Sequence, residues 1–440
     1  MTLFTQIWDF FSSVKLAIFT LCTLAATSII GTIIPQGEPS AFYVKNFGAQ
    51  TAHFFQVLDI PNMYYSWWFL GLLGTLSANL IICSLDRFPA VWKIVTADNL
   101  AVTPERVEKM SNCSKWEFAT DKHKQINVAE LLKKNGWTAS SKKIGNNELF
   151  FSQKSAWSRI GVYIVHTSIL LIFVGAIIGH FFGFKGSVMV PEMGSTQKVF
   201  AYKDAGSLEL GFELRCNSFA IEFYDNGMPK EYKSSLTVLE KGQEVLTKEI
   251  EVNSPLTYKG ITFYQSSYQG YQDFLLNITE SNSGESKQFT LPFQKQMTWE
   301  EKNLQFGIVN AEAVGQRVVR SKVWFKSGEN PASIEWINDN SKTTFTGGTK
   351  EYTVSAKQMY ATGLQVAKDP GVWVVYIGCC VMLLGLYIAF FMSHQRIWLY
   401  KNNDSSVPQL WLSGSANKNK MGFAKVLSEL KKCIDQAVQR

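Results

Sequence analysis

The stretch IGVYIVHTSILLIFVGAIIGHFF, from Ile160 to Phe182, contains no Asp, Glu, Lys or Arg. About 20 consecutive apolar residues suffice for an α-helix to cross the hydrocarbon core of a bilayer. A charge at mid-membrane costs roughly 2.5–3.5 kcal/mol on an insertion scale, whereas a soluble core helix has little reason to exclude charge over such a length. We therefore interpret this stretch as a transmembrane helix.

Three further stretches are similar in length and also contain no charged residue: Leu16 to Ile34, Trp67 to Leu85, and Val372 to Met392. A cleaved signal peptide is an alternative for the first, although that run is long for a signal and has no clear small-residue cleavage site before Pro35. Charged residues make up 18% of the 440 residues, below the roughly 25% typical of soluble proteins. The expected fold class is a membrane bundle of four transmembrane helices with a large β-rich extracytoplasmic domain.

The distribution of Lys and Arg predicts the orientation. Between Ser84 and Arg159 there are about 13 of these residues and after Met392 about 8, whereas Pro35 to Ser66 contains one. The positive-inside bias places both termini and the middle loop in the cytoplasm. The formal net charge of +7 then reflects topology and contact with the lipid bilayer, so no nucleic-acid partner is expected.

Nine segments follow from the spans and their orientation. They are a cytoplasmic N-terminus (1–15), a helix (16–34), an extracytoplasmic loop (35–66), a helix (67–85), a cytoplasmic insert (86–159), a helix (160–182), the extracytoplasmic domain (183–371), a helix (372–392) and a cytoplasmic tail (393–440). The expected location is the cell inner membrane, with several passes and the large domain on the periplasmic side.

Residues 183–371 have the alternating pattern of β-strands. Expected strands are Phe219 to Tyr224, followed by a turn at Asp225-Asn226-Gly227, then Ser235 to Leu239, Ile250 to Val252 and Ile261 to Tyr264, with a turn containing Pro255 and Gly260. Short strands spaced about 8–12 residues apart favour a sandwich or a barrel over a βαβ fold. Only Cys216 falls in this segment and no C-x-x-C occurs, so neither an internal disulfide nor thioredoxin-like chemistry is expected there.

The cytoplasmic insert shows signs of local folding but no catalytic constellation. A short helix is expected from Val128 to Asn135, ended by Gly136, and a strand is expected at Leu149 to Phe151. His123 lies among charged residues and is interpreted as part of a solvated loop. In the second helix, Asn79 is expected to form a hydrogen bond to another helix.

Histidines in the third helix are the candidate site residues. His166 lies about 10 Å from the cytoplasmic end of the helix and His180 roughly 21 Å further along it. An ionisable residue within a membrane span is a functional candidate by default, and imidazole is the usual protein ligand of haem iron. His166 is therefore a candidate axial ligand and His180 a secondary one; a structural hydrogen bond to a neighbouring helix is the alternative. His394, beside the inner membrane face, is expected to snorkel or to contact lipid.

Several short motifs occur in a characteristic order. They are Lys15 to Ile18, Ser28 to Gln36, Ser66 to Phe69, Asn79 to Arg87, Gly161 to His166, Gly183 to Gly186, Phe223 to Asp225, Val252 to Leu256, Phe263 to Tyr268, Asp369 to Gly371, and His394 to Trp398. In their order, spacing and topology, these motifs make the sequence resemble the ResB-type cytochrome c biogenesis proteins of the System II haem-attachment pathway.

The resemblance implies that haem b is moved from the cytoplasm across the membrane, as a transported substrate, and attached by two thioether bonds to a C-x-x-C-H motif of apocytochrome c. It also implies a ResC/CcsA-type partner that carries a tryptophan-rich haem-handling segment. That segment is absent here, and no fused partner is expected after the fourth helix. The chain would be a subunit of a cytochrome c synthase; no catalytic residue of its own is assigned.

Two other functions remain open at this point. The first is an apocytochrome-binding chaperone or assembly scaffold that never ligates haem, and the residues do not separate it from a haem-delivery subunit. The second is a membrane sensor whose outer domain binds a periplasmic ligand. A sensor needs an output module, and the cytoplasmic segments show none.

Overall fold

The computed structural model describes residues 2–110, 112–117, 127–202, 206–224, 228–314, 317–339, 341–404 and 407–439. His123 and the expected turn at Asp225 to Gly227 lie outside these ranges. The chain divides into two compact units, Met1–Val174 with Trp373–Arg440, called here the helical unit, and Gly175–Val372, called the β-unit.

Four helices are long and apolar enough to cross a membrane, which confirms the predicted number of spans: α2 (Val14–Ile33), α5 (Trp67–Thr96), α9 (Gly161–Phe182) and α10 (Val372–Phe391). A short helix, α1 (Leu3–Phe11), precedes α2. The amide of Asn79 in α5 donates hydrogen bonds to the carbonyl oxygens of Phe11 and Ser13, where α1 gives way to α2. The predicted helix-to-helix hydrogen bond of Asn79 is therefore confirmed; the carbonyl of Ser13 also accepts from the backbone N–H of Ala17 in α2.

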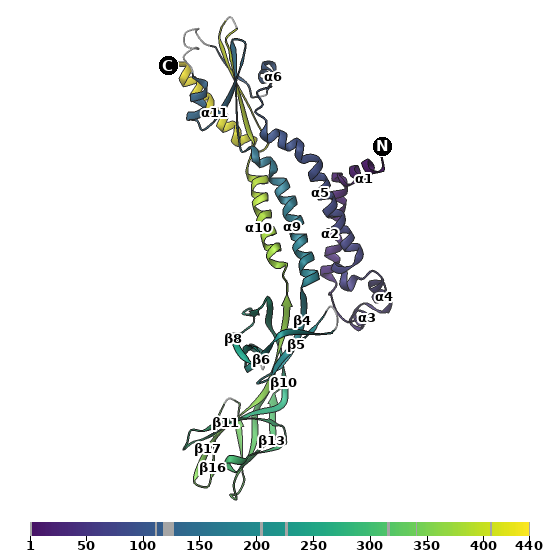
Figure 1. Cartoon of the computed structure of the whole chain (residues 1–440), viewed down its shortest axis with the longest axis vertical. Coiled ribbons are helices and arrows are strands. Elements are labelled where there is room, and N and C mark those ends of the chain that lie inside the picture. The colour runs from purple at the N-terminus through teal and green to yellow at the C-terminus, as the bar shows by residue number, and fades with distance from the viewer. Residues whose placement is uncertain are drawn as a thin grey trace. The chain divides into compact units, whose positions relative to one another are not determined.

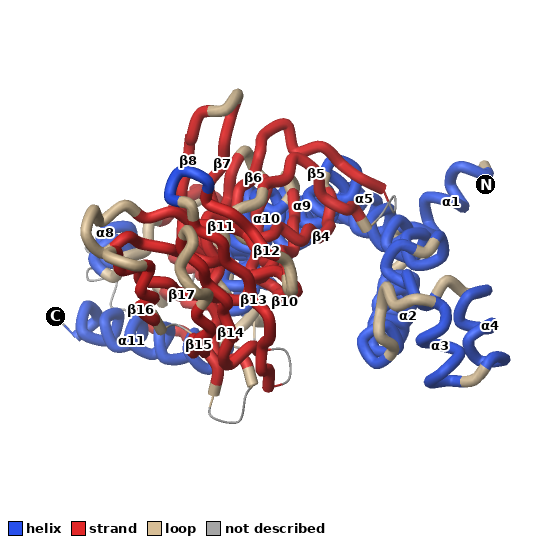
Figure 2. The backbone as a smooth tube through the Cα atoms, turned by 90° about the horizontal axis from the view of Figure 1, so that it is seen from below, coloured by secondary structure: helices blue, strands red, loops and turns tan. Residues whose placement is uncertain are grey.

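Between α2 and α5 the chain folds into α3 (Ser40–Phe47), α4 (Ala49–Val57) and the 3₁₀ helix η1 (Ile60–Tyr65). The side chain of Gln36 accepts a hydrogen bond from the backbone N–H of Met63, and the hydroxyl of Tyr43 donates one to the carbonyl of Pro35. Tyr43 is almost fully buried in a small core under these helices. Figure 2 shows α3 and α4 as short helices beside α2.

Helices α9 and α10 run side by side in close contact (Figure 1). A Cβ added at Gly378 would lie 2.7 Å from Cγ1 of Ile172, and one added at Gly385 would lie 2.9 Å from Cγ2 of Val165. Small residues at such positions let helix backbones approach one another, which is the usual basis of helix association in a bilayer.

The insert and the tail form one α/β domain. Its antiparallel sheet has the strand order β1-β19-β18-β3-β2. The strands are β1 (Ser114–Glu117), β2 (Ala139–Ile144), β3 (Asn147–Lys154), β18 (Gln395–Asn402) and β19 (Gln409–Ala416); the helices are α6 (Pro104–Glu108), α8 (Val128–Lys134) and α11 (Lys420–Gln439). The sequence prediction described the insert and the tail as separate segments, and the structure corrects this.

Each face of this sheet has its own apolar core. One face packs against α8 and α11, and the other against α6 and the segment that follows α5. The helix expected from Val128 is α8, with Gly136 just beyond it at a φ of 74°, and the strand expected at Leu149 lies within β3. These local predictions are confirmed. The 3₁₀ helix η2 (Ala156–Ile160) connects β3 to α9.

The β-unit contains almost only strands (Figure 2), which confirms the predicted β-rich domain. A ten-stranded sheet has the main order β11-β10-β17-β4-β5-β6-β7-β8, with β9 and β16 at its margins, and a four-stranded sheet has the order β12-β13-β14-β15. The strands are β4 (Phe184–Pro191), β5 (Ser195–Ala201), β6 (Gly206–Phe223), β7 (Pro229–Glu240), β8 (Gln243–Ile250), β9 (Leu256–Tyr258), β10 (Ile261–Glu280), β11 (Ser286–Pro292), β12 (Gln296–Trp299), β13 (Leu304–Val314), β14 (Arg317–Ser327), β15 (Ser333–Asn338), β16 (Thr343–Gly347) and β17 (Lys350–Lys368).

The prediction of uniformly short strands was wrong, because β6, β10 and β17 are each 18 residues or longer. Register shifts interrupt β10 between Gln265 and Ser267 and again between Gly270 and Phe274. A bulge changes which face successive side chains occupy, so a long strand breaks into short alternating pieces when it is read from sequence. Tyr224 and Val252 also lie just beyond the ends of β6 and β8.

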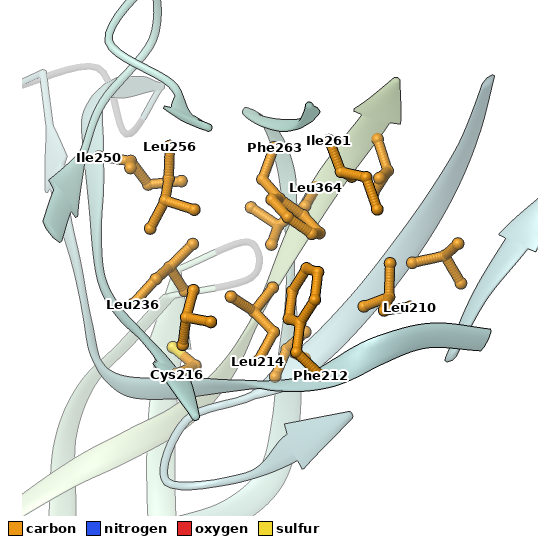
Figure 3. Packing of buried hydrophobic residues seen from close by; sticks show 14 of the residues in the cluster. Leu210, Phe212, Leu214, Cys216, Leu236, Ile250, Leu256, Ile261, Phe263 and Leu364 are labelled. Atoms are coloured by element: carbon orange, nitrogen blue, oxygen red, sulfur yellow. The ribbon is translucent and has the colours of Figure 1, made fainter. Parts of the chain in front are cut away.

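Two apolar cores fill the β-unit. In the first, alternate residues of β6, from Leu210 through Phe212 and Leu214 to Cys216, face side chains from β9, β10 and β17 such as Phe263 (Figure 3). In the second, the four-stranded sheet packs against the second half of β10 and the first half of β17. This second part is the sandwich-like packing that the sequence pattern indicated.

Candidate functional site

The side chain of His166 lies half-buried in α9, and its Nδ1 is 2.9 Å from the hydroxyl of Ser84 in α5. Hydroxyls in apolar helices usually donate to the carbonyl four residues earlier. Ser77 follows this pattern by donating to Leu73. The hydroxyl of Ser84 instead contacts the imidazole on the neighbouring helix.

This contact leaves one ring nitrogen available. When Nδ1 carries the proton and donates to Ser84, Nε2 presents a lone pair, which is the form that binds a metal ion. Within the described part of the chain, Nε2 of His166 has no hydrogen-bond partner. A ligating histidine commonly has its other ring nitrogen fixed by a hydrogen bond in this way, because the bond sets both the tautomer and the orientation of the ring.

An aromatic row leads away from His166. Its rings are those of Tyr163, Phe88, Trp92 and Trp157, and successive centroids from His166 outward are 6.2, 5.2, 5.7 and 5.8 Å apart. Trp157 and Trp92 are 62% and 42% exposed. The row therefore extends from the connection before α9, where tryptophans are accessible, to the imidazole inside the span.

Packing of three helices holds this arrangement. Ile169, Leu170 and Phe173 of α9 contact a core that Leu24 of α2 and residues of α5 form. Ser84 and His166 both belong to packed helices. Their contact therefore forms without a loop having to become ordered.

The second candidate, His180, lies in the last turn of α9 beside Phe181, with ring centroids 5.2 Å apart. Over the residues with described positions, no three His, Cys, Asp or Glu side chains gather as a metal cluster. An axial haem site requires a single imidazole and fits His166 without such a cluster.

His394 is 1% exposed, so the prediction that it snorkels or contacts lipid was wrong. Arg159 donates from Nε to Nδ1 of His394 at 3.4 Å, and Nε2 donates to Oε1 of Gln153 at 2.9 Å. The amide of Gln153 donates in turn to the carbonyl of Val95, which requires Nε2 of His394 to be the protonated nitrogen. Burial first, and then the nearby Arg396 and Arg159, lower the pKa of His394 to about 4, so the ring is neutral at pH 7.

Cys216 is fully buried among apolar side chains of the β-unit. Burial, with the nearby carboxylate of Glu192 as a smaller cause, raises the pKa of its thiol to about 12. A thiol so rarely ionised is a poor nucleophile. All seven cysteines of the chain are unpaired in the structure.

Sequence reasoning identified His166 but missed Ser84 and the aromatic row. Ser84 and His166 are 82 residues apart, and no sequence period connects them. The only available signal was the hydroxyl of Ser84, one of several polar side chains in that span, which also contains Thr75, Ser77 and Asn79. Which residue of α5 lies opposite His166 depends on how the two helices pack, and a single sequence does not reveal that.

The ResB-like family matches residues 14–355 and 308–428 of the chain. Cytochrome c biogenesis protein CcsB from Nostoc sp. is 27% identical over 443 residues, which cover 94% of this chain and 89% of that protein. CcsB from Gloeobacter violaceus is 28% identical over 446 residues, covering 94% and 88%. Cytochrome c biogenesis protein Ccs1 from Rhodomonas salina is 26% identical over 446 residues, covering 95% and 94%.

A solved structure, the cytochrome c haem lyase CcmF, aligns with 80% of this chain and 46% of its own, at 10% identity and a TM-score of 0.23. That likeness is too low to indicate a common fold. The family match spans most of the chain, and relatives of nearly equal length are named as cytochrome c biogenesis proteins. The chain belongs to the ResB-like family of cytochrome c biogenesis proteins.

Proposed function

We propose that this protein is the subunit of a membrane cytochrome c synthase that delivers haem across the inner membrane and supports its attachment to apocytochrome c. The observation that carries the proposal is the imidazole of His166, whose Nδ1 is 2.9 Å from Ser84 and whose Nε2 has no hydrogen-bond partner in the described residues. In this proposal haem is the substrate, and His166 supplies one axial ligand to its iron.

The protein's own contribution is to orient haem and to keep water away from it. Ser84 holds the imidazole in one rotation and one tautomer. The aromatic row offers ring faces along which a flat porphyrin can stack. The attachment itself adds each cysteine S–H of the C-x-x-C-H motif across a vinyl C=C of haem, so two thioether bonds form and no electron acceptor is consumed.

Orientation in the proposal follows the Lys and Arg distribution, which favours a cytoplasmic α/β domain and an extracytoplasmic β-unit. Haem is made in the cytoplasm and would then reach His166 from the accessible end of the aromatic row, at Trp157 and Trp92. The β-unit would lie on the side where apocytochrome c receives haem.

A single imidazole occupies only one face of haem iron, so the other ligand has to come from another helix or from another chain. This requirement supports a ResC/CcsA-type haem-handling membrane partner. It is also consistent with relatives whose names place them in cytochrome c biogenesis. The stoichiometric complex, rather than this chain alone, would form the synthase.

The absorption spectrum of the complex purified with its partner tests the proposal. His166→Ala should reduce the Soret absorbance per complex by at least tenfold and abolish cytochrome c maturation, while protein level and partner association persist. His53→Ala, at an exposed position on α4, is the control and should behave as wild type.

Two results would distinguish haem ligation by this chain from the chaperone function. An unchanged haem spectrum in His166→Ala would favour the chaperone function, in which the β-unit presents apocytochrome c and the imidazole merely joins two helices. Partial recovery of the Soret band on adding free imidazole to His166→Ala would support ligation, because imidazole supplies the same nitrogen donor.

A further inference from the structure

Arg396, near the start of β18, is a half-buried cation without a counter-ion. In the described ranges its guanidinium makes no hydrogen bond and no ion pair; its one recorded contact places it 5.4 Å from the centroid of the Trp398 ring. A guanidinium has five N–H donors, and partly desolvating them without acceptors is unfavourable. Water or a bound anion must therefore supply those acceptors at the exposed part of the guanidinium.

Two further arginines reinforce the positive charge. The pKa of Arg396 is lowered by burial first, and then by Arg159 and Arg106. Arg159 uses Nε to donate to His394, which fixes the side chain and leaves its terminal nitrogens for another acceptor. Neither Arg159 nor Arg106 forms an ion pair with any carboxylate whose position the structure gives. The local excess of charge is therefore not neutralised by the chain itself.

Two hydroxyl groups beside these arginines also lack partners. Ser158, adjacent to Arg159, is 3% exposed, and its Oγ has no hydrogen-bond partner among the atoms described. The same is true of the buried Oγ of Ser415, which lies directly opposite Arg396 in the β18–β19 register. Buried hydroxyls are normally hydrogen-bonded, so two unsatisfied ones beside arginines that lack carboxylate partners are unusual.

The cluster lies where the protein leaves the membrane. Arg159 is two residues before the start of α9, and Arg396 follows the end of α10 at Phe391 by one short connection. Trp157 is 62% exposed, and the ammonium of Lys418 donates to the carbonyl of Ala389 in the last turns of α10. Both residues therefore lie at the same end of the α9–α10 helix pair as the arginines. Exposed tryptophans and basic residues at helix ends are typical of the headgroup region of a bilayer.

We propose that Arg159, Arg396 and Arg106 bind the phosphate group of an anionic phospholipid. Arginine is suited to this ligand because its planar fork forms paired, charge-assisted hydrogen bonds with phosphate oxygens. The bound lipid would join the end of the α9–α10 helix pair to the sheet of the α/β domain, because the cluster draws residues from η2, α6 and β18.

Thermal unfolding of the full-length protein in detergent tests the site. Short-chain phosphatidylglycerol should raise the unfolding temperature in a saturable way, whereas phosphatidylcholine of the same chain length should not. Arg396→Gln should increase the half-saturating concentration of phosphatidylglycerol about tenfold. Arg87→Gln, at an exposed arginine of α5, is the matched control and should leave the half-saturating concentration unchanged.

A second measurement distinguishes a loss of lipid binding from a general loss of stability in the variant. Mass spectrometry of the purified protein should find phosphatidylglycerol retained by wild type and by Arg87→Gln, but depleted in Arg396→Gln. Equal stabilisation by inorganic phosphate at the same concentration would assign the cluster to a free anion and overturn the lipid site. Equal responses to phosphatidylglycerol and phosphatidylcholine, or equal retention in all three proteins, would also overturn it.

Discussion

Ser84 and His166 meet across two packed helices, with the serine Oγ 2.9 Å from Nδ1 of the imidazole. The contact separates the two roles of the ring, because one nitrogen is used to fix its orientation and the other remains available. A purely structural histidine would be expected to use both nitrogens when the ring lies inside a membrane span. The geometry therefore makes separate predictions for the two residues.

Removal of the Ser84 hydroxyl should weaken haem binding without abolishing it. Ser84→Ala leaves the imidazole in place but frees its rotation, and losing such a supporting contact typically lowers metal affinity 10–100-fold. The haem content of the purified complex, titrated against added haem, measures this effect. Ser77→Ala is the matched control, since that hydroxyl bonds only to the carbonyl of Leu73 in its own helix. Equal haem affinity in both variants would mean that Ser84 does not orient the ligand.

The α9–α10 pair should not tolerate a large side chain at Gly378. Gly378→Leu forces a side chain into space where even a Cβ would be 2.7 Å from Ile172, and overpacking of this kind costs about 1–3 kcal/mol. Lower accumulation in membranes and a lower unfolding temperature are expected. Gly74→Leu, on α5, is the control because a Cβ there meets no atom within 4 Å. Similar losses in the two variants would show that glycine is needed for a reason other than this contact.

Labelling with a membrane-impermeant maleimide checks the proposed orientation. A cysteine introduced at Lys241, in the exposed β7–β8 turn, should be labelled in intact spheroplasts. One introduced at Lys143, on an exposed position of β2, should be labelled only after permeabilisation. The parent protein corrects for its seven native thiols. The reverse pattern would show that the Lys and Arg distribution does not report the topology of this protein.

The predictable parts of the fold are those encoded locally. Four charge-free runs identify four spans, because a charged residue at mid-membrane costs several kcal/mol and the composition of each run shows that it has none. The short helix α8 is likewise encoded by its own residues, with Asn127 accepting from the N–H of Glu130 at its start and Gly136 beyond its end. The long strands were less predictable, because bulges such as that between Gly270 and Phe274 change which residues face the core.

What the sequence could not reveal depends on contacts between distant segments. The tail joins the insert because β18 pairs with β3, as in the register of Arg396 with Gln153, more than 240 residues apart in the chain. This pairing buries His394, whose short motif at a helix end had suggested lipid contact. The same pairing brings Arg159 and Arg396 together in a cluster without carboxylate partners. Nothing in the sequence connects these two arginines.

His394 should make the stability of the protein fall in mild acid. Its folded-state pKa of about 4 lies below the ordinary value of 6.5, so between these values the unfolded chain binds a proton that the folded chain does not. The contribution of His394 is thus fully present above about pH 6.5 and is lost as the pH falls toward 4. We expect a loss on the order of 1–3 kcal/mol from this residue.

The comparison with His394→Gln isolates this effect from other titrating groups. A glutamine amide can accept from Arg159 and donate to Gln153, as the neutral ring does, but it cannot be protonated. The unfolding temperature of the full-length protein, followed by tryptophan fluorescence, should therefore decline less between pH 7 and pH 4.5 in the variant than in wild type. His53→Gln, on the exposed side of α4, should decline as wild type does. Parallel declines in wild type and His394→Gln would show that the ring is already protonated in the folded protein, or that acid opens this part of the domain before the ring titrates.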